Sequence, residues 1–236
     1  MHELRLINRP RFGMVASEPF PPYAHSPQVN ASLCRPPMAQ FTMREKQIVC
    51  KTTDRARLQG RTGTEKKNDM EFTIRDAKPD DAAGVVAIFN PIIEARSFTL
   101  FDTPFSIEAE RSYIVGLTQR DIFHVAVRSS DEAIVGFQSM SPFATYTHAV
   151  DHVGVIGTYI DLGSRREGIA SLLFPVTFEA ARRKGYEKIF TYILADNQPA
   201  LATYQKHGFR IVGKAERHAK LHGRYVDVIL VEKPLL

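Results

Sequence analysis

Cysteine is nearly absent from this 236-residue chain: it occurs at Cys34 and Cys50, and none follows. A secreted scaffold held together by disulfides is therefore excluded for the long C-terminal part, which agrees with a reducing compartment. No apolar run approaches the ~18 residues that span a bilayer, and the first ten residues contain no apolar signal-peptide core. These absences predict a cytoplasmic protein that is not embedded in a membrane.

Positive charge is distributed unevenly along the chain. Residues 1–69 carry 12 Lys and Arg against 6 Asp and Glu, whereas residues 70–236 carry 19 against 20. The first segment also holds 7 of the 14 prolines. Such a segment buries too little apolar surface to offset its ordering entropy. We therefore expect residues 1–69 to be a disordered basic extension. A further hypothesis, that Met70 is the initiator, would make this extension no part of the native protein.

Apolar periodicity from residue 71 onward predicts alternating strands and helices. We expect strands at 71–77, 123–128, 133–140, 152–161, 188–195, 209–213 and 225–232, and helices at 80–96, 108–117, 164–184 and 198–207. An Asp at position 80 or 81 is expected to cap the first helix. This order predicts one α/β (α+β) domain over residues 70–236, with a mixed, mostly antiparallel sheet flanked by helices. Pro91 and Pro175 fall inside two helices, where proline removes a backbone hydrogen bond, so kinks or shorter helices are expected there.

The most informative segment is 157–171, in which an apolar strand passes through a short turn into a helix. The first amides of a helix have no internal partners and carry the positive end of its dipole, so such a junction can hold an anion. Gly168 allows the main chain to approach that anion, Ala170 keeps the next position small, and Arg165 and Arg166 add positive charge. The segment predicts a pyrophosphate site. An ordinary turn with a solvated Arg pair is the alternative.

A second segment, 196–209, follows one strand later. It places Asn197 at a strand end and Gly208 just past the end of a helix. Within that helix, Ala200 and Tyr204 are four residues apart and share one side. A small-residue face with one phenol at its far end suits a groove beside a slender ligand. Alternatively, Tyr204 is a core aromatic and Asn197 a capping residue.

Together the two segments resemble the GNAT superfamily of acyl-CoA-dependent N-acetyltransferases, on Arg165-x-x-Gly168-x-Ala170, Asn197, Ala200, Tyr204 and Gly208-Phe209. The resemblance covers nearly all of residues 71–236. A narrower resemblance is to the phosphinothricin and amino-acid N-acetyltransferase branch, on Ile74-Arg-Asp-Ala77, Asp80-Asp81, Ile88-Phe-Asn90 and residues 98–104.

The resemblance implies acetyl-CoA as co-substrate, bound where strand 152–161 splays from strand 188–195. The main chain near Tyr159 and Ile160 would pair with the pantetheine arm, and Asn197 would hydrogen-bond that arm. The pyrophosphate would be held by the segment Arg165, Arg166, Glu167, Gly168, Ile169, Ala170 and Ser171.

The resemblance also implies catalytic roles. Tyr204 would be the acid that protonates the departing thiolate, and no metal is needed. The branch carries a glutamate as its usual base, but the matching position here is Val155. Asp151, Asp161 and His152 are nearby candidates, and His152 is preferred because histidine titrates near neutral pH.

The acceptor site in this superfamily commonly lies between the first two helices. Phe98, Phe101 and Phe105 fall there and predict an apolar pocket, although loop aromatics buried in the core would look the same. Arg111 is the nearest downstream cation that could meet a substrate carboxylate.

We interpret the chain as an enzyme that transfers acetyl from acetyl-CoA to a primary amine of a small molecule, such as an amino acid or an amine-bearing xenobiotic. The alternatives are a protein or peptide N-acetyltransferase and a non-catalytic acyl-CoA-binding regulator. We expect no nucleic-acid or membrane partner, although nucleic-acid binding by the basic extension is an alternative. A homodimer is common among proteins of this type.

Overall fold

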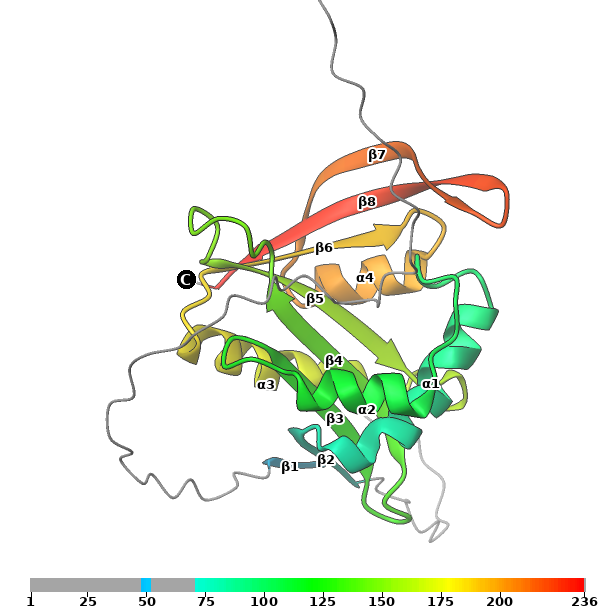
Figure 1. Cartoon of the computed structure of the whole chain (residues 1–236), viewed down its shortest axis with the longest axis vertical. Coiled ribbons are helices and arrows are strands. Elements are labelled where there is room, and N and C mark those ends of the chain that lie inside the picture. The colour runs from blue at the N-terminus through cyan, green and yellow to red at the C-terminus, as the bar shows by residue number, and fades with distance from the viewer. Residues whose placement is uncertain (1–47, 52–70, 236) are drawn as a thin grey trace, which may run out of the picture. The chain divides into compact units, whose positions relative to one another are not determined.

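The computed structural model describes residues 48–51 and 71–235 (Figure 1). Its strands are β1 (Ile48–Lys51), β2 (Glu71–Asp76), β3 (Ile122–Arg128), β4 (Ile134–Pro142), β5 (Val153–Ile160), β6 (Lys188–Leu194), β7 (Arg210–Leu221) and β8 (Arg224–Pro234). Its α-helices are α1 (Ala82–Glu94), α2 (Ile107–Val115), α3 (Ile169–Arg183) and α4 (Gln198–Lys206). Short 3-10 helices η1 (Pro79–Asp81) and η2 (Leu162–Ser164) precede α1 and α3. From residue 71 onward the predicted order of strands and α-helices is confirmed.

The described strands form one sheet in the order β1-β2-β3-β4-β5-β6-β8-β7. Neighbouring strands are antiparallel except β5 and β6, which run parallel. The prediction of a mixed, mostly antiparallel sheet is therefore confirmed. The parallel pair joins two antiparallel halves, and its geometry decides where a ligand can enter.

Helices cover both faces of the sheet (Figure 1). Side chains along each strand alternate between the two faces, and both faces carry apolar side chains that the helices bury. On one face, Phe89 of α1 packs against Phe137 of β4 and Tyr159 of β5, with ring centroids 5.5 Å and 4.4 Å away. On the other face, Phe174 of α3 and Tyr204 of α4 are buried in one cluster with Ile156 of β5. Burying both faces makes the sheet a rigid frame for the loops at its edges.

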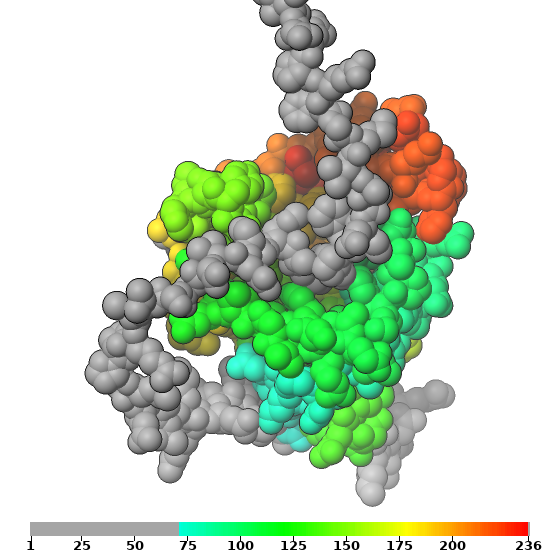
Figure 2. Space-filling model, viewed as in Figure 1, coloured from blue at the N-terminus to red at the C-terminus, as the bar shows by residue number. Residues whose placement is uncertain are grey.

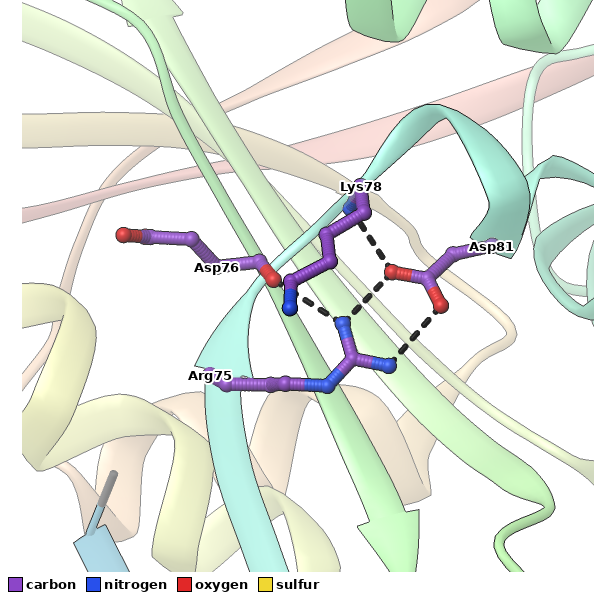
Figure 3. Close-up of polar contacts among 4 residues, drawn as sticks. All are labelled: Arg75, Asp76, Lys78 and Asp81. Atoms are coloured by element: carbon purple, nitrogen blue, oxygen red, sulfur yellow. Dashed lines mark hydrogen bonds and ion pairs between the residues drawn. The ribbon is translucent and has the colours of Figure 1, made fainter. Parts of the chain in front are cut away.

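The turn between β2 and α1 is fixed by a bidentate ion pair (Figure 3). The Arg75 guanidinium donates to both carboxylate oxygens of Asp81, at 2.6 Å and 2.8 Å, and the Lys78 amide donates to the same carboxylate at 2.7 Å. Asp81 precedes α1, as expected, but its side chain makes no cap hydrogen bond to that helix. The carboxylate instead ties the start of α1 to the end of β2, which positions α1 over the sheet.

Several element boundaries differ from the predictions. The third α-helix begins at Ile169 rather than at residue 164, because residues 162–164 form η2. Both α1 and α3 continue through their prolines, and Pro91 lies in the last part of α1, which ends at Glu94. The sequence analysis expected kinks or shorter helices at these two prolines, and both helices are shorter than predicted, although neither is interrupted at its proline.

The final strands are much longer than predicted. They form a hairpin whose pairing extends from Arg210 with Glu232 to Leu221 with Arg224. His222 and Gly223 connect the strands, and both have positive φ, as a two-residue hairpin turn of this kind requires. The residues of β7 are mostly exposed and polar, so no apolar alternation marks the outer half of this hairpin.

Most of the predicted disordered extension, residues 1–69, lies outside the described residues. Within it, Ile48–Lys51 form the edge strand β1, antiparallel to β2, with Cys50 opposite Phe72. The sequence analysis did not anticipate this strand. Among the described helices, none has the length and apolar character needed to cross a bilayer.

Candidate acyl-transfer site

A slot opens between β5 and β6. The two strands pair only from Val153 with Lys188 to Val155 with Phe190. Beyond these pairs β5 stays with β4 as far as Ile160, while β6 stays with β8 as far as Leu194. The strands therefore diverge toward their C-terminal ends (Figure 1), as the sequence analysis expected.

Alternation of the β5 hydrogen bonds shows which main-chain groups face this slot. The Val153 carbonyl accepts from Phe143 and the Asp161 amide donates to Val135, so the odd-numbered residues of β5 bond to the β4 side. The even-numbered residues, including Thr158 and Ile160, direct their amides and carbonyls to the slot. Of the two residues expected to pair with a cofactor arm, Ile160 presents its main chain there.

Tyr159 has a different position. Its main chain belongs to the β4 side by the same alternation, and its ring packs against Phe89 and Phe137 at 4.4 Å and 4.9 Å between centroids. Burial raises the pKa of the Tyr159 phenol, which opposes ionisation. Tyr159 thus shapes the wall of the α1 and α2 face.

The turn after β5 is built by a local cap. The Asp161 carboxylate accepts from the Gly163 amide at 3.1 Å and from the Ser164 hydroxyl at 3.0 Å. These bonds explain Asp161 as a structural residue of the turn rather than a base. The chain then passes through Arg166, with φ of 71°, and Gly168, with φ of 83°. This left-handed conformation at Gly168 is one that glycine adopts without steric cost.

The N-terminus of α3 is available for an anion. Gly168 offers no side chain to cap the helix, so the first amides, at Ile169, Ala170 and Ser171, retain the unpaired donors of a helix start. The Ile169 side chain is buried in the core, which leaves its main chain for a ligand. One carboxylate oxygen of Glu167 is buried without a hydrogen-bond partner in the described part of the chain.

Arg165 connects this helix start with the loop between α1 and α2. Its guanidinium lies 4.1 Å from the centroid of the Phe98 ring. Burial of part of the side chain lowers the pKa of Arg165, although a guanidinium stays charged at neutral pH. The structure thus brings together one residue predicted for the pyrophosphate and one predicted for the acceptor.

Tyr204 of α4 and Thr158 of β5 meet on the α3 and α4 face. The Tyr204 Oη lies 3.0 Å from Thr158 Oγ1, and Gln138 of β4 donates to the same Thr158 oxygen from Nε2 at 2.7 Å. Tyr204 is 6% exposed. Burial raises the pKa of Tyr204 to about 12, and the hydrogen bond with Thr158 acts in the opposite direction. The phenol is therefore protonated at neutral pH and can serve as an acid.

Asn197 is the N-cap of α4. Its side-chain oxygen accepts from the Ala200 amide at 3.3 Å, which confirms the capping interpretation. Because that bond uses Oδ1, any contact with a cofactor arm would come from the Nδ2 donors.

His152 does not reach Tyr204. It is exposed just before β5, at the end where β5 and β6 are paired. It lies six positions before Thr158, a distance of roughly 20 Å along an extended strand. The preference for His152 as the base therefore receives no geometric support. Val155, where the branch carries its glutamate, offers no ionisable group.

The predicted acceptor residues fall into two groups. Phe101 and Phe105 both pack against Phe89, with centroids 5.1 Å and 5.5 Å away, and form one aromatic wall with it. Arg111 instead pairs with Asp80 of η1 at 2.8 Å, so it faces η1.

Two segments project above α2 in Figure 2: the loop between β4 and β5, and the β7–β8 hairpin. The loop between β4 and β5 contains the exposed side chains of Phe143 and Tyr146.

The sequence analysis missed a buried carboxyl group. Glu110 of α2 is 6% exposed, and no cation among the described residues forms an ion pair with it. Burial raises its pKa to about 7. The helical spacing to buried Ile114 could have placed Glu110 on the inner side of α2. The contacts of Thr158 with Tyr204 and with Gln138 were also missed, because no pattern of neighbouring residues in the sequence indicates them.

A sheet that splays at one parallel pair, with an uncapped helix start after β5 and a buried phenol beside Thr158 of the same strand, indicates a protein of the acetyltransferase class. The model of the Acetyltransferase (GNAT) family matches residues 92–209. The chain belongs to this family and is an N-acetyltransferase near the phosphinothricin and amino-acid branch.

Known proteins match about 70% of this chain and nearly all of their own length. Phosphinothricin N-acetyltransferase of Streptomyces coelicolor is 24% identical over 70% of this chain and 97% of its own length. The L-methionine sulfoximine/L-methionine sulfone acetyltransferase of Pseudomonas aeruginosa is 25% identical over 69% and 94%. A phosphinothricin acetyltransferase of Sinorhizobium meliloti, solved in complex with acetyl-CoA, has a TM-score of 0.64 and 21% identity over 69% and 88%.

Proposed function

We propose that this enzyme transfers an acetyl group from acetyl-CoA to the primary amine of a small molecule of the amino-acid type. The observation that carries the proposal is the position of Tyr204 at the slot between β5 and β6, with the α3 N-terminus following β5. Support for the acceptor class comes from relatives named for phosphinothricin and for methionine sulfoximine.

The chain would hold the co-substrate along the slot. The α3 amides at Ile169, Ala170 and Ser171, with Arg165 and Arg166 beside them, would bind the pyrophosphate. The outward main chain of Thr158 and Ile160 would pair with the pantetheine arm, as an added strand pairs with a sheet edge. This arrangement would direct the thioester toward Tyr204.

Tyr204 would then supply the proton that the thiolate takes when the neutral amine attacks the thioester carbonyl. Its raised pKa keeps the phenol protonated until that moment. A proton must also leave the amine. Val155 cannot accept this proton, so we propose that water removes it from the amine.

The test combines binding with turnover on the full chain. Calorimetry should show acetyl-CoA binding that Arg165→Ala and Gly168→Glu both weaken, and CoA release should appear with amino-acid amines. Arg183→Ala, at the other end of α3, is the control. Absence of acetyl-CoA binding by folded protein would refute the proposal.

A further inference from the structure

A row of polar side chains crosses the sheet beneath α3 and ends at Tyr204. Asp76, His124, Gln138 and Thr158 are consecutive register partners on β2, β3, β4 and β5. Figure 1 shows these four strands side by side. Gln138 is fully buried and His124 is 5% exposed. Polar residues in such a place need partners, so their contacts indicate what the row does.

The row divides into two separate groups by its hydrogen bonds. His124 contacts Thr177 of α3 at 2.8 Å and Asp76 at 3.3 Å. Gln138 instead bonds toward the slot, from Nε2 to Thr158 Oγ1 at 2.7 Å, and its Oε1 has no partner among the described residues. The Gln138 amide is therefore oriented by Thr158 alone.

This orientation determines the direction of the next hydrogen bond. A threonine hydroxyl has one proton and two acceptor positions. Since Gln138 donates to Thr158 Oγ1, the oxygen keeps its own proton for another acceptor, and Tyr204 Oη lies 3.0 Å away. If Thr158 donates to Oη, the Tyr204 proton is free to point toward the slot.

We infer that Thr158, held by Gln138, is a positioning residue that aims the Tyr204 proton at the leaving thiolate and stabilises the phenolate left behind. The inference rests on the proposed function, because it concerns the acid of that reaction. The balance is simple: the Tyr204 O–H bond breaks, the proton joins the thiolate sulfur, and Thr158 donates a hydrogen bond to the resulting phenolate oxygen.

The first experiment is a double-mutant cycle between Thr158→Val and Tyr204→Phe. A positioned general acid contributes on the order of a hundredfold or more, so we expect Tyr204→Phe to lower kcat strongly and Thr158→Val to lower it about tenfold. Added to Tyr204→Phe, Thr158→Val should change kcat less than about twofold, because residues acting as one unit are not additive. The Kd for acetyl-CoA should stay within about twofold.

Matched variants separate positioning from packing. Thr158→Ser keeps the hydroxyl and should restore most of the lost kcat. Gln138→Met keeps the volume, removes the donor and should lower kcat less than Thr158→Val. Thr177→Val removes another buried hydroxyl, bonded to His124, and should leave kcat unchanged even if it lowers stability.

A readout independent of turnover is the 13C resonance of the Tyr204 ring carbon that bears the hydroxyl, assigned with Tyr204→Phe. It should shift in Thr158→Val and stay in place in Thr177→Val. An unchanged resonance, full additivity in the cycle, or a Thr158→Val rate equal to wild type would each overturn the inference. Failure of the wild type to release CoA with any amine would instead refute the proposed function itself.

Discussion

The guanidinium of Arg165 lies over the ring of Phe98, 4.1 Å from its centroid. Arg165 precedes the α3 N-terminus, and Phe98 belongs to the loop between α1 and α2. In the proposed function, Arg165 lies beside the pyrophosphate and Phe98 lies on the acceptor side, so this contact would link the two halves of the site.

This contact predicts that Phe98→Ala weakens acetyl-CoA binding without removing a charge. A cation–π contact at a partly exposed site contributes about 0.5–1 kcal/mol, so the Kd should rise about two- to fivefold. Phe98→Tyr should bind like wild type, because it retains the ring. Calorimetry of the three proteins is the measurement, and equal Kd values would show that Phe98 does not orient Arg165.

Gly168 should be required for both stability and binding. It has φ of 83° at the start of α3, and Gly185 has φ of 81° after the end of the same helix. Alanine at either position should lower the free energy of unfolding by about 1 kcal/mol, because a left-handed conformation is costly for a residue with a Cβ. Only Gly168→Ala should also weaken acetyl-CoA binding. Equal affinities of the two variants would contradict the proposed anion site.

Glu110 should make stability fall as pH rises. Burial raises its pKa from 4.5 to about 7, so the folded state holds a proton that the unfolded state releases between these values. Glu110→Gln should therefore match wild type below pH 4.5 and become more stable than wild type above pH 7, by at most about 3 kcal/mol. Urea unfolding across this range is the measurement. Glu108→Gln, exposed on the same helix, is the control, and a constant difference across pH would count against a buried neutral Glu110.

The ion pair of Arg75 with Asp81 should stabilise the domain above acidic pH. Burial of Asp81 tends to raise its pKa, but the hydrogen bonds from Arg75 and Lys78 prevail and lower it below 3.8. The contribution is thus present above the unfolded value and is lost as pH falls through the folded pKa. Asp81→Asn should lower the free energy of unfolding by about 1–3 kcal/mol at pH 7, with a smaller loss near pH 3. Asp80→Asn, whose side chain is 96% exposed, should have little effect.

Local patterns in the sequence were sufficient for the order of the elements and for the glycine that precedes α3. Gly168 before a helix start and Asn197 at a strand end are signals of a few neighbouring residues, and both occupy the expected positions. The outer part of the β7–β8 hairpin was missed because its side chains are exposed and its His222-Gly223 turn lacks the usual signal.

The assignment of His152 as the base stays a prediction, although the structure places it far from Tyr204. His152 was chosen for its chemistry and its nearness in sequence to the cofactor motif. A strand advances about 3.3 Å per residue. His152 is therefore close to Thr158 in sequence but far from it, and from Tyr204, in space. Proximity within an extended strand is therefore poor support for a shared site.

By itself, the sequence determined the fold class, the glycine-led helix start and the membership of the acetyltransferase family, since each depends on periodicity or on short-range backbone chemistry. Only the tertiary structure decided that Thr158 meets Tyr204 across 46 residues and that Gln138 meets Thr158 across 20. These contacts depend on strand register and on how helices pack over the sheet. Register and packing are set by the whole domain at once, so no local segment encodes them.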